Sequence, residues 1–126
     1  MNYQQIRAYM MNKPETTEDF PFGEQSAVFR LREKIYAILY MEGDCARVNL
    51  KCEPEQANAL RDIFPSVIPG YHMNKKHWNT VISDGSIPQS EIERMIDHSY
   101  ELIFKGLKKA DQKVLSMKFG AQLKVE

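Results

Sequence analysis

The spacing of apolar residues changes from helical to alternating in the first half of the chain. Residues 3–12 place apolar side chains on one helical face, which predicts an N-terminal helix that ends before Pro14. Residues 27–32, 35–40 and 47–52 alternate apolar and polar side chains or are rich in β-branched and aromatic residues, as is typical of strands. Short polar breaks separate these segments, so we expect three antiparallel strands joined by tight turns.

The second half of the chain predicts a helix, another hairpin and the longest helix. Pro54 opens a helical stripe of apolar residues, at a position where the missing N–H of proline costs nothing. Residues 71–73 and 77–82 are interpreted as two strands joined at 74–76. Residues 90–107 carry apolar side chains at steps of three and four, which indicates an amphipathic helix.

Three local expectations complete the pattern. Ser90 and Glu93 match a capping box at the start of the long helix. Residues 20–23 form an aromatic turn that we expect to pack under the first helix. A short helical tail is expected at about 111–118, with frayed residues after it.

Together these elements predict one α+β domain with the order α-βββ-α-ββ-α. We expect an antiparallel sheet with its helices packed on one face. A length of 126 residues suits a single domain, here residues 1–126, with a core at about 3–109 and a tail at 110–126.

Charge is balanced overall but not along the chain. Seventeen basic and seventeen acidic side chains give a net charge of zero, which argues against coating nucleic acid by bulk charge. Residues 28–51 and 75–76 nevertheless carry more basic than acidic side chains, as does the segment 101–124. The basic tail fits either a solvated helix end that complements the macrodipole or a phosphate-contacting surface.

Compartment and chemistry are constrained mainly by what the sequence lacks. The N-terminus is too polar for a signal peptide, and no apolar run approaches the roughly 18 residues that span a membrane, so a cytoplasmic protein is expected. Cys45 and Cys52 are expected to be free thiols. Catalytic and phosphate-loop motifs are absent, and lysines separate His72 from His77, so we expect no enzyme activity, cofactor or metal.

The run of residues 71–78 mixes aromatic rings, an amide and two lysines. Rings of this kind can stack on bases and lysines can contact phosphates, which favours nucleic-acid binding. The alternative interpretation is that Tyr71 and Trp78 anchor the core while the lysines lie in water.

Four segments, in this order, resemble the MmcQ/YjbR family of small bacterial proteins. They are TEDFPFG at 17–23, VNLKC at 48–52, PGYHMNKKHWN at 69–79 and DHSYEL at 97–102. The resemblance implies a CyaY-like α+β fold whose two β-hairpin wings form a double-wing DNA-binding motif. It places the DNA contacts at the matched hairpin tip and the neighbouring strand, on Lys51, Asn74, Lys75, Lys76 and His77.

Local charge adds Arg30, Arg32 and Lys34 to this set. The leading hypothesis is a monomeric, non-catalytic DNA-binding protein that contacts phosphates with these cations. One alternative is a protein-interaction or small-ligand adaptor that uses the surface of residues 71–78. A remote alternative is a frataxin-like metal carrier, for which Glu15, Glu18 and Asp19 would supply a partial acidic ridge. The leading hypothesis requires cations far apart in sequence to converge on one surface.

Overall fold

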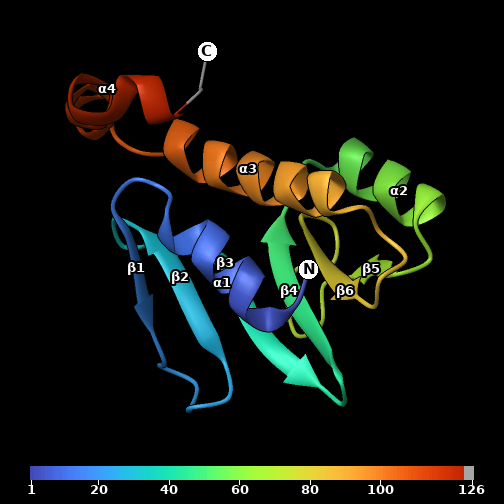
Figure 1. Ribbon diagram of the computed structural model, residues 1–126. Coiled ribbons are helices and arrows are strands. Elements are labelled where there is room, and N and C mark those ends of the chain that lie inside the picture. Colours follow the sequence, from blue (N-terminus) through green and yellow to red (C-terminus); the bar gives the residue numbers. More distant parts are fainter. Residues whose placement is uncertain (124–126) are drawn as a thin grey trace.

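A six-stranded antiparallel sheet forms the centre of the protein, with strand order β1-β2-β3-β4-β6-β5. The computed structural model describes residues 1–123 (Figure 1). The elements are α1 (Tyr3–Met11), β1 (Thr16–Asp19), β2 (Ala27–Leu31), β3 (Lys34–Glu42), β4 (Cys45–Lys51), α2 (Pro54–Ile63), β5 (Val67–Pro69), β6 (Trp78–Ser83), α3 (Gln89–Lys105) and α4 (Lys109–Leu123).

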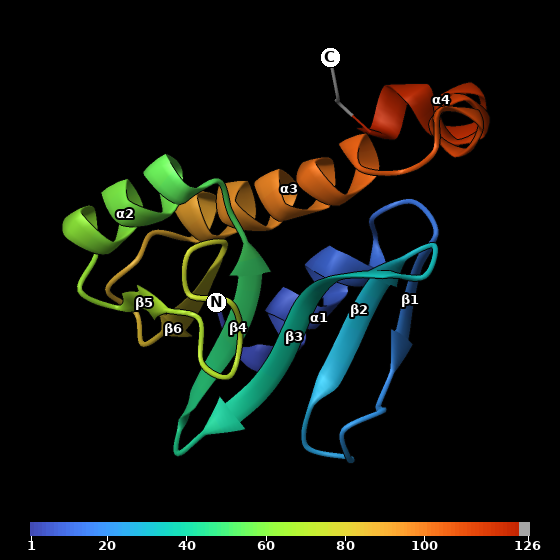
Figure 2. The ribbon, with the colours of Figure 1, turned by 180° about the vertical axis from the view of Figure 1, so that it is seen from behind.

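Helices pack on one face of this sheet. α1 contacts β1 and β3, and α3 contacts β2, β3 and β4. Seen from behind, strands β2 and β3 lie in front of α1, and the loop between β5 and β6 crosses the sheet on the side away from α1 (Figure 2). We call this second side the open face. The predicted α+β fold, with an antiparallel sheet and helices on one face, is confirmed.

The core lies between the sheet and the helices. One cluster of buried side chains joins Ile6 of α1, Phe29 of β2, Val48 of β4 and Ile96 of α3, all fully buried. Burying a side chain of this size stabilises the fold by about 1.5–3 kcal/mol. The apolar strand positions predicted from the sequence therefore form one side of the core, and the apolar faces of the helices form the other side.

Two strand assignments were wrong. Residues 16–19, for which the sequence predicted no strand, form β1, which pairs with β2 and extends the sheet by one edge strand. Residues 71–73 do not form a strand, because β5 pairs with β6 instead and residues 70–77 form a loop. His72 in this loop has φ of 58°, a left-handed conformation that does not fit a strand.

Three smaller expectations also differ from the structure. α3 begins at Gln89 after Pro88, and no side chain caps it, so the Ser90–Glu93 capping box is not formed. The aromatic turn does not pack under α1, because Phe22 is 68% exposed. The tail helix is longer than expected, and its Leu115 is fully buried in the core cluster. The expected fraying at the last residues, 124–126, lies outside the described part of the chain.

Among the described residues, none of the helices combines the length and apolar character needed to cross a membrane.

Candidate nucleic-acid interface

Sheet register brings the predicted lysines to one end of the sheet. β3 begins at Lys34 and β4 ends at Lys51, and because the two strands are antiparallel both lysines lie at the same end. Trp78, the first residue of β6, pairs with Lys51, so the loop that carries Lys75 and Lys76 ends there too. We call Lys34, Lys51, Lys75 and Lys76 the lysine set.

The loop of residues 70–77 is held by hydrogen bonds within it and to its neighbours. Asn74 accepts from the N–H of Lys76 through its side chain at 3.0 Å, and from the N–H of His77 through its carbonyl at 3.1 Å. The carbonyl of His77 in turn accepts from the N–H of Cys52 at 2.8 Å. Asn74 and His77 therefore shape the loop through turn geometry, while Lys75 and Lys76 remain exposed at its tip.

Arg61 of α2 clamps the same loop from the helical layer. Its Nε donates to the side-chain oxygen of Asn79 at 2.7 Å, and its Nη2 donates to the carbonyls of Trp78 and Lys75. Sequence reasoning missed this residue, because an arginine on an amphipathic helix carries no local sign of the loop it will contact.

The eight residues predicted to contact DNA differ in whether a carboxylate neutralises their charge. Arg30 pairs with Asp19 at 3.1 Å and Arg32 with Glu15 at 3.5 Å, so carboxylates of the first hairpin neutralise both arginines. Within residues 1–123, no ion pair involves the lysine set. The unneutralised charge therefore lies on Lys34, Lys51 and the loop tip.

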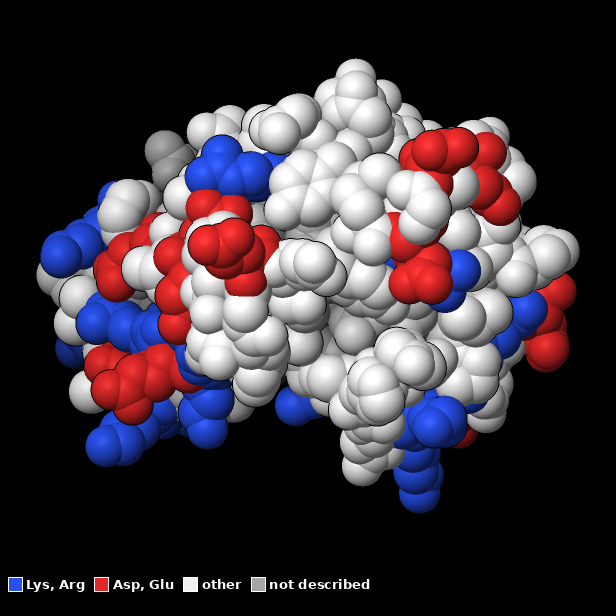
Figure 3. All heavy atoms as spheres, turned by 90° about the horizontal axis from the view of Figure 1, so that it is seen from below, with Lys and Arg blue, Asp and Glu red and all other residues white. Residues whose placement is uncertain are grey.

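Acidic side chains lie at both ends of the sheet: Glu15, Glu33 and Glu53 flank the strand ends beside the lysine set. The turns at the end opposite the lysine set carry Glu24, Glu42, Asp44 and Asp84. Figure 3 looks at the end opposite the lysine set, where basic and acidic side chains intermingle on both sides and the middle of the face is uncharged. On this face the cations do not merge into a continuous positive surface.

Asp97 and Ser99 of the DHSYEL segment on α3 have structural roles. Asp97 accepts from the hydroxyl of Tyr9 at 2.7 Å and pairs with Lys13. The Ser99 hydroxyl accepts from the N–H of Lys51 at 2.9 Å and donates to the carbonyl of Tyr36 at 2.6 Å. These bonds fix α3 to the end of α1 and to two central strands.

Comparison with known proteins identifies the family of this chain. The model of the family described as YjbR matches residues 11–102, most of the chain. The chain belongs to the YjbR family. It is 37% identical over 94 residues to the uncharacterized protein YbdF of Escherichia coli O157:H7, covering 75% of this chain and 77% of YbdF. It is 30% identical over 115 residues to the uncharacterized protein YjbR of Escherichia coli K12, covering 91% and 98% of the two chains.

Solved structures share both the fold and the sequence signal. A crystal structure of the Deinococcus radiodurans protein DR2400, with a domain named DUF419, superposes with a TM-score of 0.83 at 36% identity, covering 91% of this chain and 88% of that one. A crystal structure of a Pseudomonas syringae protein gives a TM-score of 0.71, also at 36% identity, covering 81% and 98%.

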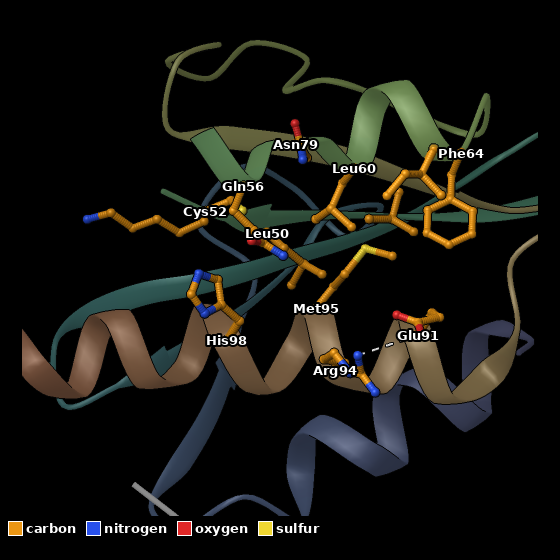
Figure 4. Close-up of a pocket in the computed structure, with 13 residues that line it drawn as sticks. Leu50, Cys52, Gln56, Leu60, Phe64, Asn79, Glu91, Arg94, Met95 and His98 are labelled. Atoms are coloured by element: carbon orange, nitrogen blue, oxygen red, sulfur yellow. Dashed lines mark ion pairs between the residues drawn. The ribbon is translucent and has the colours of Figure 1, made fainter. Parts of the chain in front are cut away.

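In this YjbR-family chain, a cleft of about 440 Å³ separates α2 from α3 (Figure 4). Leu60 and Met95 extend into it from the two helices, and Cys52 lines it beside Gln56. Burial raises the pKa of the Cys52 thiol to about 11, so the thiol stays protonated near neutral pH. A neutral thiol is a poor nucleophile, so Cys52 is not activated for nucleophilic attack in this cleft.

The acidic residues of the metal hypothesis are engaged by arginines. Glu18 accepts two hydrogen bonds from Arg7, at 2.6 and 2.9 Å. Asp19 and Glu15 hold the paired arginines already described. Across residues 1–123, no three metal-ligating side chains gather into a possible site. The acidic ridge is therefore a set of ion pairs rather than a free array of oxygen ligands.

Proposed function

We propose that this YjbR-family protein binds duplex DNA without catalysing a reaction, and that the lysine set makes the phosphate contacts. The observation that supports this most is the position of four lysines at one end of the sheet, none of which forms an ion pair within the described part of the chain. Each lysine that neutralises a phosphate releases condensed counterions, which favours binding at low salt.

The proposal depends mainly on the two lysines at the tip of the loop. Lys75 and Lys76 are exposed, whereas Lys51 is half-buried. Because Arg61 and Asn74 fix the loop backbone, the two tip lysines reach a phosphate without the loop first losing its conformational freedom. Arg30 and Arg32 drop out of the proposed contacts, because binding a phosphate through either would require breaking an ion pair.

Titration of a labelled 20-base-pair duplex at several salt concentrations tests the proposal. Affinity is expected to fall linearly in log salt, with about 0.9 of slope for each phosphate neutralised. Lys75→Ala combined with Lys76→Ala is expected to reduce that slope by about two. Lys108→Ala with Lys109→Ala removes the same charge at the start of α4 and is expected to leave the slope unchanged.

Two results would overturn the proposal. The first is an absence of binding at about 50 mM salt, where phosphate contacts are strong. The second is an equal loss of slope in both double variants, since that would reflect net charge rather than contacts made by the loop tip.

A further inference from the structure

A second cavity, of about 550 Å³, lies on the open face of the sheet. Ile35, Ile38 and Tyr40 of β3 line it, and Phe22 and Tyr71 come from the two loops beside it. This volume falls in the range of sites that enclose a small molecule. The cavity is separate from the cleft between α2 and α3, which the sheet places on the other side.

The loop wall of this cavity is anchored to the sheet beneath it. The N–H of Tyr71 donates to the Thr80 hydroxyl at 3.0 Å, and that hydroxyl donates to the Asn49 side chain at 2.6 Å. Asn49 and Thr80 are almost fully buried, so the network holds Tyr71 over the floor in a fixed position. The cavity is thus largely formed before any ligand arrives.

Several features at this cavity are energetically unfavourable when no ligand is bound. Phe22 and Tyr71 are 68% and 60% exposed, so large rings face water. His72 adopts a left-handed conformation with φ of 58° and places its ring 4.0 Å from that of Tyr71. The Tyr40 hydroxyl is buried beside Thr80 and Arg47, but it forms no hydrogen bond of normal geometry within the described residues. Exposed rings, backbone strain and an unpaired polar group often mark a binding site.

The lining restricts the chemistry of the ligand. It consists mainly of aromatic, methionine and isoleucine side chains, with Met41 and Met73 beside the rings. In the described chain, Glu42 is the only Asp, Glu, Lys or Arg that lines the cavity. Rings and thioethers suit a flat aromatic molecule, and ring faces together with one carboxylate favour a positive charge. Arg47 pairs with Tyr40 across the strands but does not line the cavity, so Glu42 is the charged group of this set that a ligand meets directly among the described residues.

We propose that the open-face cavity binds a flat aromatic cation of small-molecule size. The proposal depends on Phe22, Tyr71 and Glu42 and not on the lysine set. It therefore stands or falls independently of DNA binding.

Two acridines of opposite charge test the proposal with one ring system. Proflavine is cationic and acridine-9-carboxylate is anionic, and each is titrated into nuclease-treated protein and followed by fluorescence and calorimetry. We expect one proflavine per chain, bound at least about tenfold more tightly than the carboxylate. Glu42→Gln is expected to remove most of this preference.

Ring variants locate the site. Phe22→Ala and Tyr71→Ala are each expected to weaken proflavine binding by at least about fivefold, since a stacked ring contributes about 1 kcal/mol or more. Phe20→Ala is the matched control, because Phe20 lies on the same loop and is exposed but does not line the cavity. It is expected to leave binding unchanged.

Three outcomes would overturn the proposal. The first is that proflavine does not bind at concentrations up to about 1 mM, since a site for a ligand of this size should bind more tightly. The second is equal affinity for the two acridines. The third is proflavine binding that is unchanged in both ring variants. In each case the lysine variants of the DNA experiment keep their own expected result, so the two proposals fail separately.

Discussion

The side chains of Arg61 and Asn79 are joined by a hydrogen bond of 2.7 Å from Nε to the amide oxygen. The same guanidinium donates at 3.3 Å to the carbonyl of Trp78, and also to the carbonyl of Lys75. One side chain of α2 thus holds the backbone at both Lys75 in the loop and Trp78 at the start of β6. Through Arg61, helix α2 therefore positions the lysine-bearing loop, which lies outside the packed layer of helices.

Replacing Arg61 with alanine is expected to loosen the loop and weaken DNA binding together. Losing these bonds should lower the free energy of unfolding by about 1–3 kcal/mol, as measured by urea denaturation. DNA affinity should fall while its salt slope stays the same, because the lysines remain present.

The control for this prediction is Asn58→Ala. Asn58 accepts from Nη1 of Arg61 at 3.4 Å in an exposed position, so its loss should change stability by less than about 0.5 kcal/mol. A drop in salt slope for Arg61→Ala, as large as that of the lysine double variant, would instead indicate that Arg61 itself contacts phosphate.

Ser99 and Ser90, both on α3, should respond very differently to alanine substitution. Ser99→Ala leaves the N–H of Lys51 and the carbonyl of Tyr36 without their partner, which should cost about 1–3 kcal/mol of stability. Ser90→Ala should change stability by less than about 0.5 kcal/mol, because the structure forms no capping bond there. A loss of stability near 1 kcal/mol for Ser90→Ala would instead indicate that the capping box predicted from the sequence is formed.

Gly70 is required by packing rather than by its backbone angle. A Cβ atom there would lie 2.7 Å from Cβ of Trp78 and 2.9 Å from its carbonyl oxygen. Gly70→Ala must therefore push the loop away from β6, and we expect it to destabilise the fold by about 1–3 kcal/mol in thermal or urea melts. Gly106→Ala is the control, since its nearest contacts would be at 3.5 Å. Equal stability of the two variants would contradict the close approach of loop and strand.

Sequence reasoning predicted those helices and strands in which buried residues recur at a regular spacing of two to four positions along the chain. The strands around Phe29 and Val48 alternate because one side faces the helices, and α3 shows its stripe because it lies across the sheet. β1 gave no such signal, since its residues are polar and pair with β2 through contacts that span the first hairpin. Short edge strands of this kind are recognised only when their partner is known.

The candidate site was predicted only in part for the same physical reason. Residue type identified the cations, but their partners are distant in sequence. Arg30 is neutralised by Asp19, eleven residues earlier, and nothing local distinguishes it from an unpaired lysine. Arg61 and the open-face cavity depend on tertiary packing, which charge counts along the chain do not contain.

The two cysteines should differ in reactivity in the native protein. Cys45 is half-exposed at the start of β4, whereas Cys52 is 5% exposed and protonated. At pH 8 a thiol reagent such as Ellman's reagent should label one cysteine per chain quickly, and both once the protein is denatured. Rapid labelling of both thiols in the folded protein would contradict the buried position of Cys52.

Cys52 should also make stability depend on pH at the alkaline end. An unfolded thiol has a pKa near 8.5, whereas burial raises the pKa of Cys52 to about 11 in the folded state. The folded protein thus keeps a proton that the unfolded chain releases, and the stability present below about pH 8.5 is lost as the pH rises toward 11. Urea melts between pH 8 and 10 should show this decline, and it should be shallower in Cys52→Ala than in Cys45→Ala. Tyr36 also has a pKa raised by burial and contributes to the decline in both variants, so the evidence lies in the difference between them. Identical slopes would contradict the assignment.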